Sequence, residues 1–137
     1  MQIHLKKGEK IYVNGAVLRV DRRTTLEFLN DIDFLLEGHV IQAQQATTPF
    51  RQLYFVVQTM LMDPANAGMT LEVFKHLAHR LGQALETPEL SEALKEATSR
   101  VDNQRYFDAL RQLRIAFQFE DRLLDKGAAN RGTTPCL

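Results

Sequence analysis

Several residue types and patterns that mark particular protein classes are scarce or absent in this sequence. Cysteine occurs once, at Cys136, so no intrachain disulfide can form. The longest apolar stretch, residues 53–62, is interrupted by Gln58 and Thr59 and is far shorter than the ~18–20 residues of a membrane span. The first residues also lack the apolar segment and the small-residue cleavage site of a signal peptide. We therefore expect a cytoplasmic protein that makes no contact with membranes.

An excess of charge of either sign is also absent, since 17 lysines and arginines balance 17 aspartates and glutamates. This balance excludes a nucleic-acid binder that is basic throughout, such as a histone-like protein. Any nucleic-acid site must then be a local patch on a neutral body. With 45% hydrophobic positions, the chain is too apolar for a disordered protein. A length of 137 residues fits one compact domain or two small modules that share a core.

Catalytic motifs are missing as well. The sequence contains no G-x-S-x-G, no P-loop and no G-x-G-x-x-G pattern. The carboxylates do not form a pair in an apolar setting, and we interpret Glu120 and Asp121 as part of a solvated face. Cys136 has no stable histidine partner for use as a nucleophile. We therefore predict a protein that is not an enzyme and that needs no cofactor.

The best candidates for a metal site are two histidines. His76 and His79 lie three residues apart in a helical segment, with Glu72 one turn before His76, so the three share one helix face. The full H-E-x-x-H pattern is absent, and no third ligand is evident. We interpret these residues as an exposed polar face and predict no metal.

Turn residues punctuate the first 45 residues. Asn14-Gly15 is a strong hairpin signal, because both residues tolerate a positive φ angle. Around it, short apolar segments predict an antiparallel meander of four to six strands, one face of which needs a cover. The segments are residues 3–5, 11–13, 16–20, 25–29, 34–36 and 40–41.

A helical period begins at Thr48. Thr48-Pro49 and Thr87-Pro88 each read as an N-cap followed by proline in the first helical position. Helices are predicted over residues 49–62, 70–86, 88–100 and 102–124. The first is apolar almost all round, so we expect it to be buried against the sheet or a second chain, and we predict a homodimer. The expected fold is α+β, with an N-terminal antiparallel β-meander (residues 1–45) packed on a C-terminal bundle of three or four helices (46–125) and a disordered tail (126–137).

Positive charge is concentrated near the start of the chain, where residues 1–25 carry six cations and only two anions. On a small sheet these cations can form a basic face that binds phosphates, with Tyr12 for base stacking. The alternative is a strand edge that lysines and arginines merely protect from aggregation. Strand alternation prevents all of them from facing one way, and the residues beside turns are the best candidates. The candidate RNA-binding residues, with one further arginine beside the Thr48-Pro49 helix start, are Lys6, Lys7, Lys10, Arg19, Arg22, Arg23 and Arg51.

Three blocks of sequence, in order, are similar to the FlbT family of flagellin regulators, and the resemblance covers residues 3–125. The first block contains Leu5-Lys6-Lys7-Gly8-Glu9-Lys10, Val13-Asn14-Gly15-Ala16-Val17 and Asp21-Arg22-Arg23. The second reads Thr47-Thr48-Pro49-x-Arg51-x-x-Tyr54-Phe55. The third reads Tyr106-Phe107-x-Ala109-Leu110, followed by Glu120-Asp121.

This resemblance implies a cytoplasmic regulator that controls flagellin synthesis after transcription. Its expected partner is the 5′ untranslated leader of flagellin mRNA, whose translation or decay it affects. A small FlaF-type protein is expected to oppose it or to work with it. An alternative is a protein–protein adaptor that binds flagellin, its chaperone or the FlaF-type partner without touching RNA. A contiguous positive patch favours RNA, and an exposed apolar groove favours the adaptor.

Overall fold

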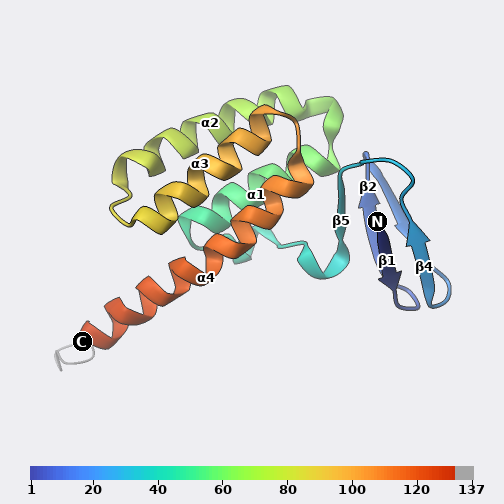
Figure 1. Cartoon of the computed structure of the whole chain (residues 1–137), viewed down its shortest axis with the longest axis horizontal. Coiled ribbons are helices and arrows are strands. Elements are labelled where there is room, and N and C mark those ends of the chain that lie inside the picture. The colour runs from blue at the N-terminus through green and yellow to red at the C-terminus, as the bar shows by residue number, and fades with distance from the viewer. Residues whose placement is uncertain (132–137) are drawn as a thin grey trace.

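The computed structural model describes the backbone of residues 1–131 and the side chains of residues 1–124. Five short strands come first and four long helices follow (Figure 1). Two 3-10 turns lie between β5 and α1, and a third lies between α1 and α2. The α+β class predicted from the sequence is confirmed. The elements are β1 (Gln2–Leu5), β2 (Lys10–Val13), β3 (Ala16–Arg19), β4 (Thr24–Glu27), β5 (Phe34–Leu36), η1 (Glu37–His39), η2 (Ala43–Gln45), α1 (Pro49–Met62), η3 (Pro64–Asn66), α2 (Ala67–Ala84), α3 (Pro88–Asp102) and α4 (Tyr106–Arg131).

The strands pair differently from a simple meander. They form two antiparallel sheets, β1–β4 and β3–β2–β5, so only the β2–β3 hairpin joins neighbours in sequence. Asn14 and Gly15 form its turn with φ angles of 49° and 83°, as a primed turn requires. Burial explains the other pairings, because they bring Leu5 of β1, Ile11 of β2 and Phe34 of β5 into one small apolar cluster. Residues 40–41, predicted as a further strand segment, lie in the connection to α1.

Helix α1 lies at the centre of the helical part, where it contacts α2 and α4, and α3 packs on α4 (Figure 1). Its bounds match the prediction, and Thr48 caps its N-terminus by accepting a hydrogen bond from the Arg51 amide. Seven of its residues are buried, which confirms the prediction of a buried helix. Within residues 1–131, no helix is both long and apolar enough to cross a membrane.

Several helix boundaries differ from the prediction. Helix α2 covers Ala67–Ala84 instead of residues 70–86. Helix α3 continues to Asp102, and the chain then turns through Gln104, which has a positive φ angle of 58°, so α4 begins at Tyr106. Helix α4 continues to Arg131, and the predicted disordered tail is therefore wrong for residues 126–131, which are helical. Residues 132–137, the rest of that predicted tail, lie outside the described residues.

Contacts around β5 hold the strands against the helices. The Phe34 ring stacks on the Phe107 ring of α4, with centroids 4.5 Å apart and an interplanar angle of 20°. Beside it, the Asp33 carboxylate accepts a hydrogen bond of 3.0 Å from the Phe107 amide, near the N-terminus of α4. This is the end of a helix that favours an anionic partner. Leu35, on the other side of β5, belongs to the helical core.

Candidate functional site

The six N-terminal cations gather at one end of the strands. The Gly8 amide donates a hydrogen bond of 2.8 Å to the Val20 carbonyl, and the Val20 amide donates one of 3.2 Å to the Glu9 carbonyl. These bonds place the β1–β2 turn beside the β3–β4 turn. Lys10 lies directly opposite Arg19 in the β2–β3 register. We call the resulting surface the basic end, which consists of Lys6, Lys7, Lys10, Arg19, Arg22 and Arg23.

The basic end is largely open to solvent, since all of its residues are exposed except Lys10, which is half-buried. Two of the three carboxylates near it accept hydrogen bonds from backbone amides instead of pairing with the cations. Glu9 accepts a hydrogen bond from the Lys6 amide, and Glu37 accepts one from the Lys10 amide. Asp21 forms a loose ion pair of 3.4 Å with Arg22, with both side chains more than 80% exposed. Such a pair is weak, so Arg22 can exchange it for a phosphate.

Tyr12 does not lie with these cations as the basic-face interpretation expected. Its side chain is half-buried and packs against the helical core. On β3, Val17 lies opposite Tyr12 and Leu18 lies opposite Ile11, and both of these β3 side chains are apolar and exposed. The basic end therefore offers charge for phosphates without this aromatic platform for bases.

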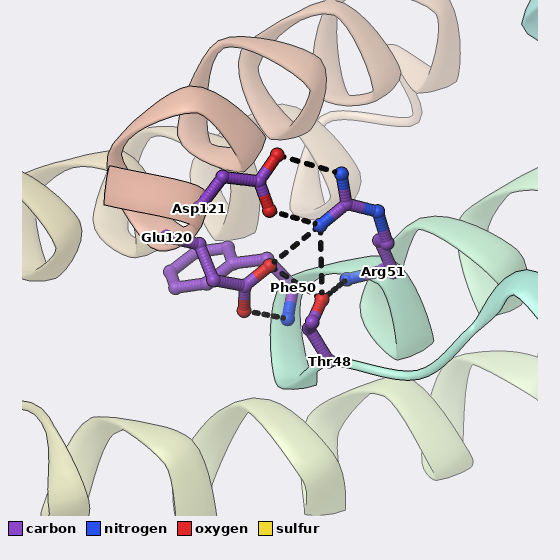
Figure 2. A network of polar contacts seen from close by, with 5 residues as sticks. All are labelled: Thr48, Phe50, Arg51, Glu120 and Asp121. Carbon is purple, nitrogen blue, oxygen red and sulfur yellow. Dashed lines mark hydrogen bonds and ion pairs between the residues drawn. The ribbon is translucent and has the colours of Figure 1, made fainter. Parts of the chain in front are cut away.

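Arg51, the seventh candidate, lies elsewhere and is held inside a polar network between α1 and α4 (Figure 2). Its guanidinium donates to both carboxylate oxygens of Asp121, at 2.9 and 3.0 Å, and more weakly to Glu120, at 3.3 Å. It also lies 4.5 Å from the centre of the Phe117 ring. Arg51 is thus engaged within the chain, and we do not retain it in the proposed RNA surface.

Glu120 is at the centre of this network, which we call the α1–α4 clasp (Thr48, Phe50, Arg51, Glu120 and Asp121). The Glu120 carboxylate accepts hydrogen bonds from the Thr48 hydroxyl and from the Phe50 amide at the start of α1. It is only 6% exposed, so the predicted solvated face is wrong for Glu120, whereas Asp121 is half-exposed. A buried carboxylate is tolerated here because the helix N-terminus and the guanidinium both stabilise its charge.

The ionisation of the clasp reflects these contacts. The hydrogen bond from Arg51 lowers the pKa of Asp121 below its ordinary value; burial opposes this shift, and the positive charge of Arg51 adds to it. In return, the hydrogen bond to Asp121 raises the pKa of Arg51 above its ordinary value. Both groups are therefore charged at neutral pH, and the clasp serves to hold two helices together.

A second polar cluster was not found from the sequence. The Tyr54 hydroxyl donates a hydrogen bond of 2.6 Å to the His39 carbonyl and accepts one of 3.0 Å from Arg114. Burial, and then the charge of Arg114, lowers the pKa of the His39 imidazole. Burial also raises the pKa of Tyr54. Tyr54 and Arg114 are 60 positions apart, and no local pattern links residues at that separation.

The histidines considered for a metal, His76 and His79, lie on α2, and both are exposed. Among the residues that the structure describes, no three His, Cys, Asp or Glu side chains are grouped so that they can hold a metal ion.

A small α+β protein with a cluster of mostly exposed cations at one end of its strands is the class that this fold and the basic end define. Residues 1–124 match the family model described as "Flagellar protein FlbT", and the chain belongs to the FlbT family. A relative from Mesorhizobium japonicum is 48% identical over 124 residues, which cover 90% of this chain and 84% of that protein. One from Agrobacterium fabrum is 42% identical over 135 residues, covering 98% and 88%. Both are named "Probable flagellum biosynthesis repressor protein FlbT", which describes a regulatory role and not an enzymatic one. No solved structure matches the chain.

Proposed function

We propose that this protein regulates flagellin production after transcription by binding the 5′ untranslated leader of flagellin mRNA through the basic end. Membership of the FlbT family and the name of the relatives, repressors of flagellum biosynthesis, support the regulatory part of this proposal. The observation that supports the RNA part is the approach of the β1–β2 turn to the β3–β4 turn, together with the Lys10–Arg19 pair. This arrangement brings six cations to one end of the strands. The net charge of the whole protein is zero, so this local excess is where phosphate contacts are most favourable.

The test removes two cations from the basic end. We expect the variant Arg22→Ala/Arg23→Ala to bind flagellin leader RNA more weakly than the wild type. The slope of log Kd against log salt should decrease by roughly 0.7 for each phosphate that the variant no longer neutralises, as for single-stranded nucleic acid. The midpoint of thermal unfolding should stay nearly the same, because both side chains are exposed. Binding is measured by fluorescence anisotropy at several salt concentrations.

The matched control is Arg80→Ala/Arg111→Ala, which removes the same charge from exposed positions on α2 and α4. It should leave the salt slope unchanged. Equal affinity and slope for the wild type and Arg22→Ala/Arg23→Ala would show that the basic end does not bind the leader.

The second candidate function, an adaptor that binds flagellin, its chaperone or a FlaF-type protein, is favoured by strand β3. This strand lies at the edge of its sheet, all four of its residues are exposed, and Val17 and Leu18 are 60% and 49% exposed. An open apolar edge is a template for a strand from another chain. Co-purification with a FlaF-type protein that is lost on Leu18→Glu, with leader binding absent, would favour this function.

A further inference from the structure

A small pocket lies where the strands meet α4, away from the basic end and from the α1–α4 clasp. Its volume is about 210 Å³, and its walls include Ile3 of β1, Leu36 of β5 and Phe107 of α4. Gln2, His39 and Arg114 supply its polar side, and Met1 also lines it. We call it the Arg114 pocket. Strand β5, which forms part of its wall, runs along the boundary between the strands and the helices (Figure 1).

The charge of this pocket is uncompensated. No aspartate or glutamate is found among the described residues that line it. Among the ion pairs of residues 1–124, none involves Arg114, whose one hydrogen bond goes to the neutral Tyr54 hydroxyl. After burial, the positive charge of Arg114 is the second cause that lowers the pKa of the His39 imidazole. A half-buried guanidinium without a carboxylate partner is unusual, because charges taken out of water are normally paired.

From the apolar walls and the Arg114 guanidinium, we infer that the Arg114 pocket binds an apolar group that carries one carboxylate. The apolar group packs against Ile3, Leu36 and Phe107, and the carboxylate accepts hydrogen bonds from the Arg114 guanidinium, which matches its planar geometry. The planar guanidinium of one arginine side chain can donate two parallel N–H groups to the two oxygens of a carboxylate. It suits this group better than a phosphate dianion, which proteins usually hold with several cationic side chains or backbone amides. The volume admits one ring or one branched side chain.

Two sources can supply this chemistry, a small carboxylic acid or the C-terminal residue of another polypeptide. The probes are therefore 3-phenylpropionate and N-acetyl-alanyl-phenylalanine with a free carboxylate, each compared with its uncharged amide. Binding is followed by two-dimensional ¹H–¹⁵N NMR on the full chain. A probe of about eleven non-hydrogen atoms should bind with a Kd on the order of 1 mM. We expect at least one acid to shift the Phe107 and Arg114 amides and to bind about tenfold more tightly than its amide.

Two variants test the pocket in different ways. Arg114→Gln removes the charge but keeps an N–H donor for Tyr54, and it should weaken acid binding about tenfold. Leu36→Phe leaves Arg114 in place and fills the pocket, and it should abolish binding. Arg111→Gln, an exposed arginine on the same helix, is the matched control and should bind like the wild type. Unfolding midpoints for all three show whether a loss of binding reflects a loss of the fold.

The relative affinities identify the source. Tighter binding of the peptide acid indicates a polypeptide C-terminus, and tighter binding of 3-phenylpropionate indicates a small acid. The inference is wrong if each amide binds as tightly as its acid, or if folded Arg114→Gln binds like Arg111→Gln. It is also wrong if neither acid shifts these amides at 20 mM, on the order of twenty times the expected Kd, or if uridine or adenosine monophosphate binds in their place. None of these results depends on the leader RNA, so they leave the proposed function untouched.

Discussion

Glu120 illustrates at the scale of one residue how a charged side chain acquires a structural role. Its position in a helical sequence beside Asp121 suggested solvent exposure, yet the fold places it under the first turn of α1 (Figure 2). There it meets Thr48 and the Phe50 amide, which is otherwise one of the unsatisfied donors of a helix start. A residue that satisfies two buried donors is costly to replace, because those donors are left without water.

We expect Glu120→Gln to lower the free energy of unfolding by about 2 kcal/mol, since the amide has one acceptor where the carboxylate had two and loses its attraction to Arg51. Chemical denaturation monitored by circular dichroism measures this change. Glu89→Gln, an exposed glutamate on α3, is the control and should change it by less than about 0.5 kcal/mol. Equal stability for both variants would mean that the clasp does not contribute to folding.

Asp121 gives the clasp a dependence on pH. Because its pKa is lower in the folded chain than in the unfolded chain, its contribution is present above the ordinary pKa of an aspartate and is lost as the pH falls through the folded value. Asp121→Asn should therefore be less stable than the wild type at pH 7, by under about 1 kcal/mol because the pair is half-exposed. This difference should shrink below about pH 4. A difference that stays constant from pH 7 to pH 3 would rule out the ion pair as its cause.

At the scale of elements, the starts of α1 and α3 and the β2–β3 turn could be predicted from the sequence because their signals are local. Thr48-Pro49 marks the start of α1, and Asn14-Gly15 marks the hairpin. The pairing of β1 with β4 and of β2 with β5 could not be predicted, because it depends on which apolar faces meet across the small cluster around Ile11. Residues 40–41, in the connection between β5 and α1, were wrongly predicted as a strand because their hydrogen-bonding partner also lies far along the chain.

In that connection, a side chain replaces a strand as hydrogen-bonding partner. The side-chain amide of Gln58, on α1, bonds to both backbone groups of Ile41. Its oxygen accepts a hydrogen bond from the Ile41 N–H, and its nitrogen donates one to the Ile41 carbonyl, both at 2.9 Å. Gln58 is 3% exposed, so these backbone groups have little access to water. This arrangement gives an apolar, strand-like segment its hydrogen bonds without any neighbouring strand.

We therefore expect Gln58→Leu to lower the free energy of unfolding by about 2 kcal/mol, because it leaves both Ile41 backbone groups without their partner. Gln52→Leu, at an exposed position on the same helix, is the matched control and should have little effect. Both variants are compared in urea. If Gln58→Leu is as stable as the control, water must be able to satisfy the Ile41 groups.

At the scale of the whole molecule, the homodimer stays a prediction, but the argument for it changes. Helix α1 is covered by α2 and α4 of its own chain, so its apolar perimeter no longer requires a partner. The remaining candidate is the open edge of β3, where two copies can pair antiparallel about a twofold axis so that Leu18 of one copy lies opposite Leu18 of the other on the same face. Light scattering at micromolar concentration should then give twice the chain mass of 15.7 kDa, and Leu18→Glu should halve it. A mass of one chain for the wild type would contradict the dimer.

The structure brings together six of the seven candidate RNA residues, and the reason for the exception also lies at this scale. Turn and strand-pair geometry places Lys6 and Lys10 near Arg19 and Arg22, which their clustering in the sequence already suggested. Arg51 lies further along the chain, and its partner Asp121 is 70 positions away from it. The clustering of cations along the sequence predicts a local patch. It does not show which cations, like Arg51, pair with a carboxylate of a distant segment.

The strands and helices should unfold as one unit, because the joints between them are apolar and well packed. Phe34 stacks on Phe107, Asp33 caps the start of α4, and Tyr12 of β2 packs on the helical core. We expect the slowest-exchanging amides of β2, which is paired on both sides, and of α1 to report opening free energies that agree within about 1 kcal/mol. Hydrogen exchange followed by NMR measures both in the same sample, and amides of the edge strand β3 should exchange faster. Opening of β2 at a cost several kcal/mol below that of α1, on the order of half the global stability or less, would show two separable modules instead.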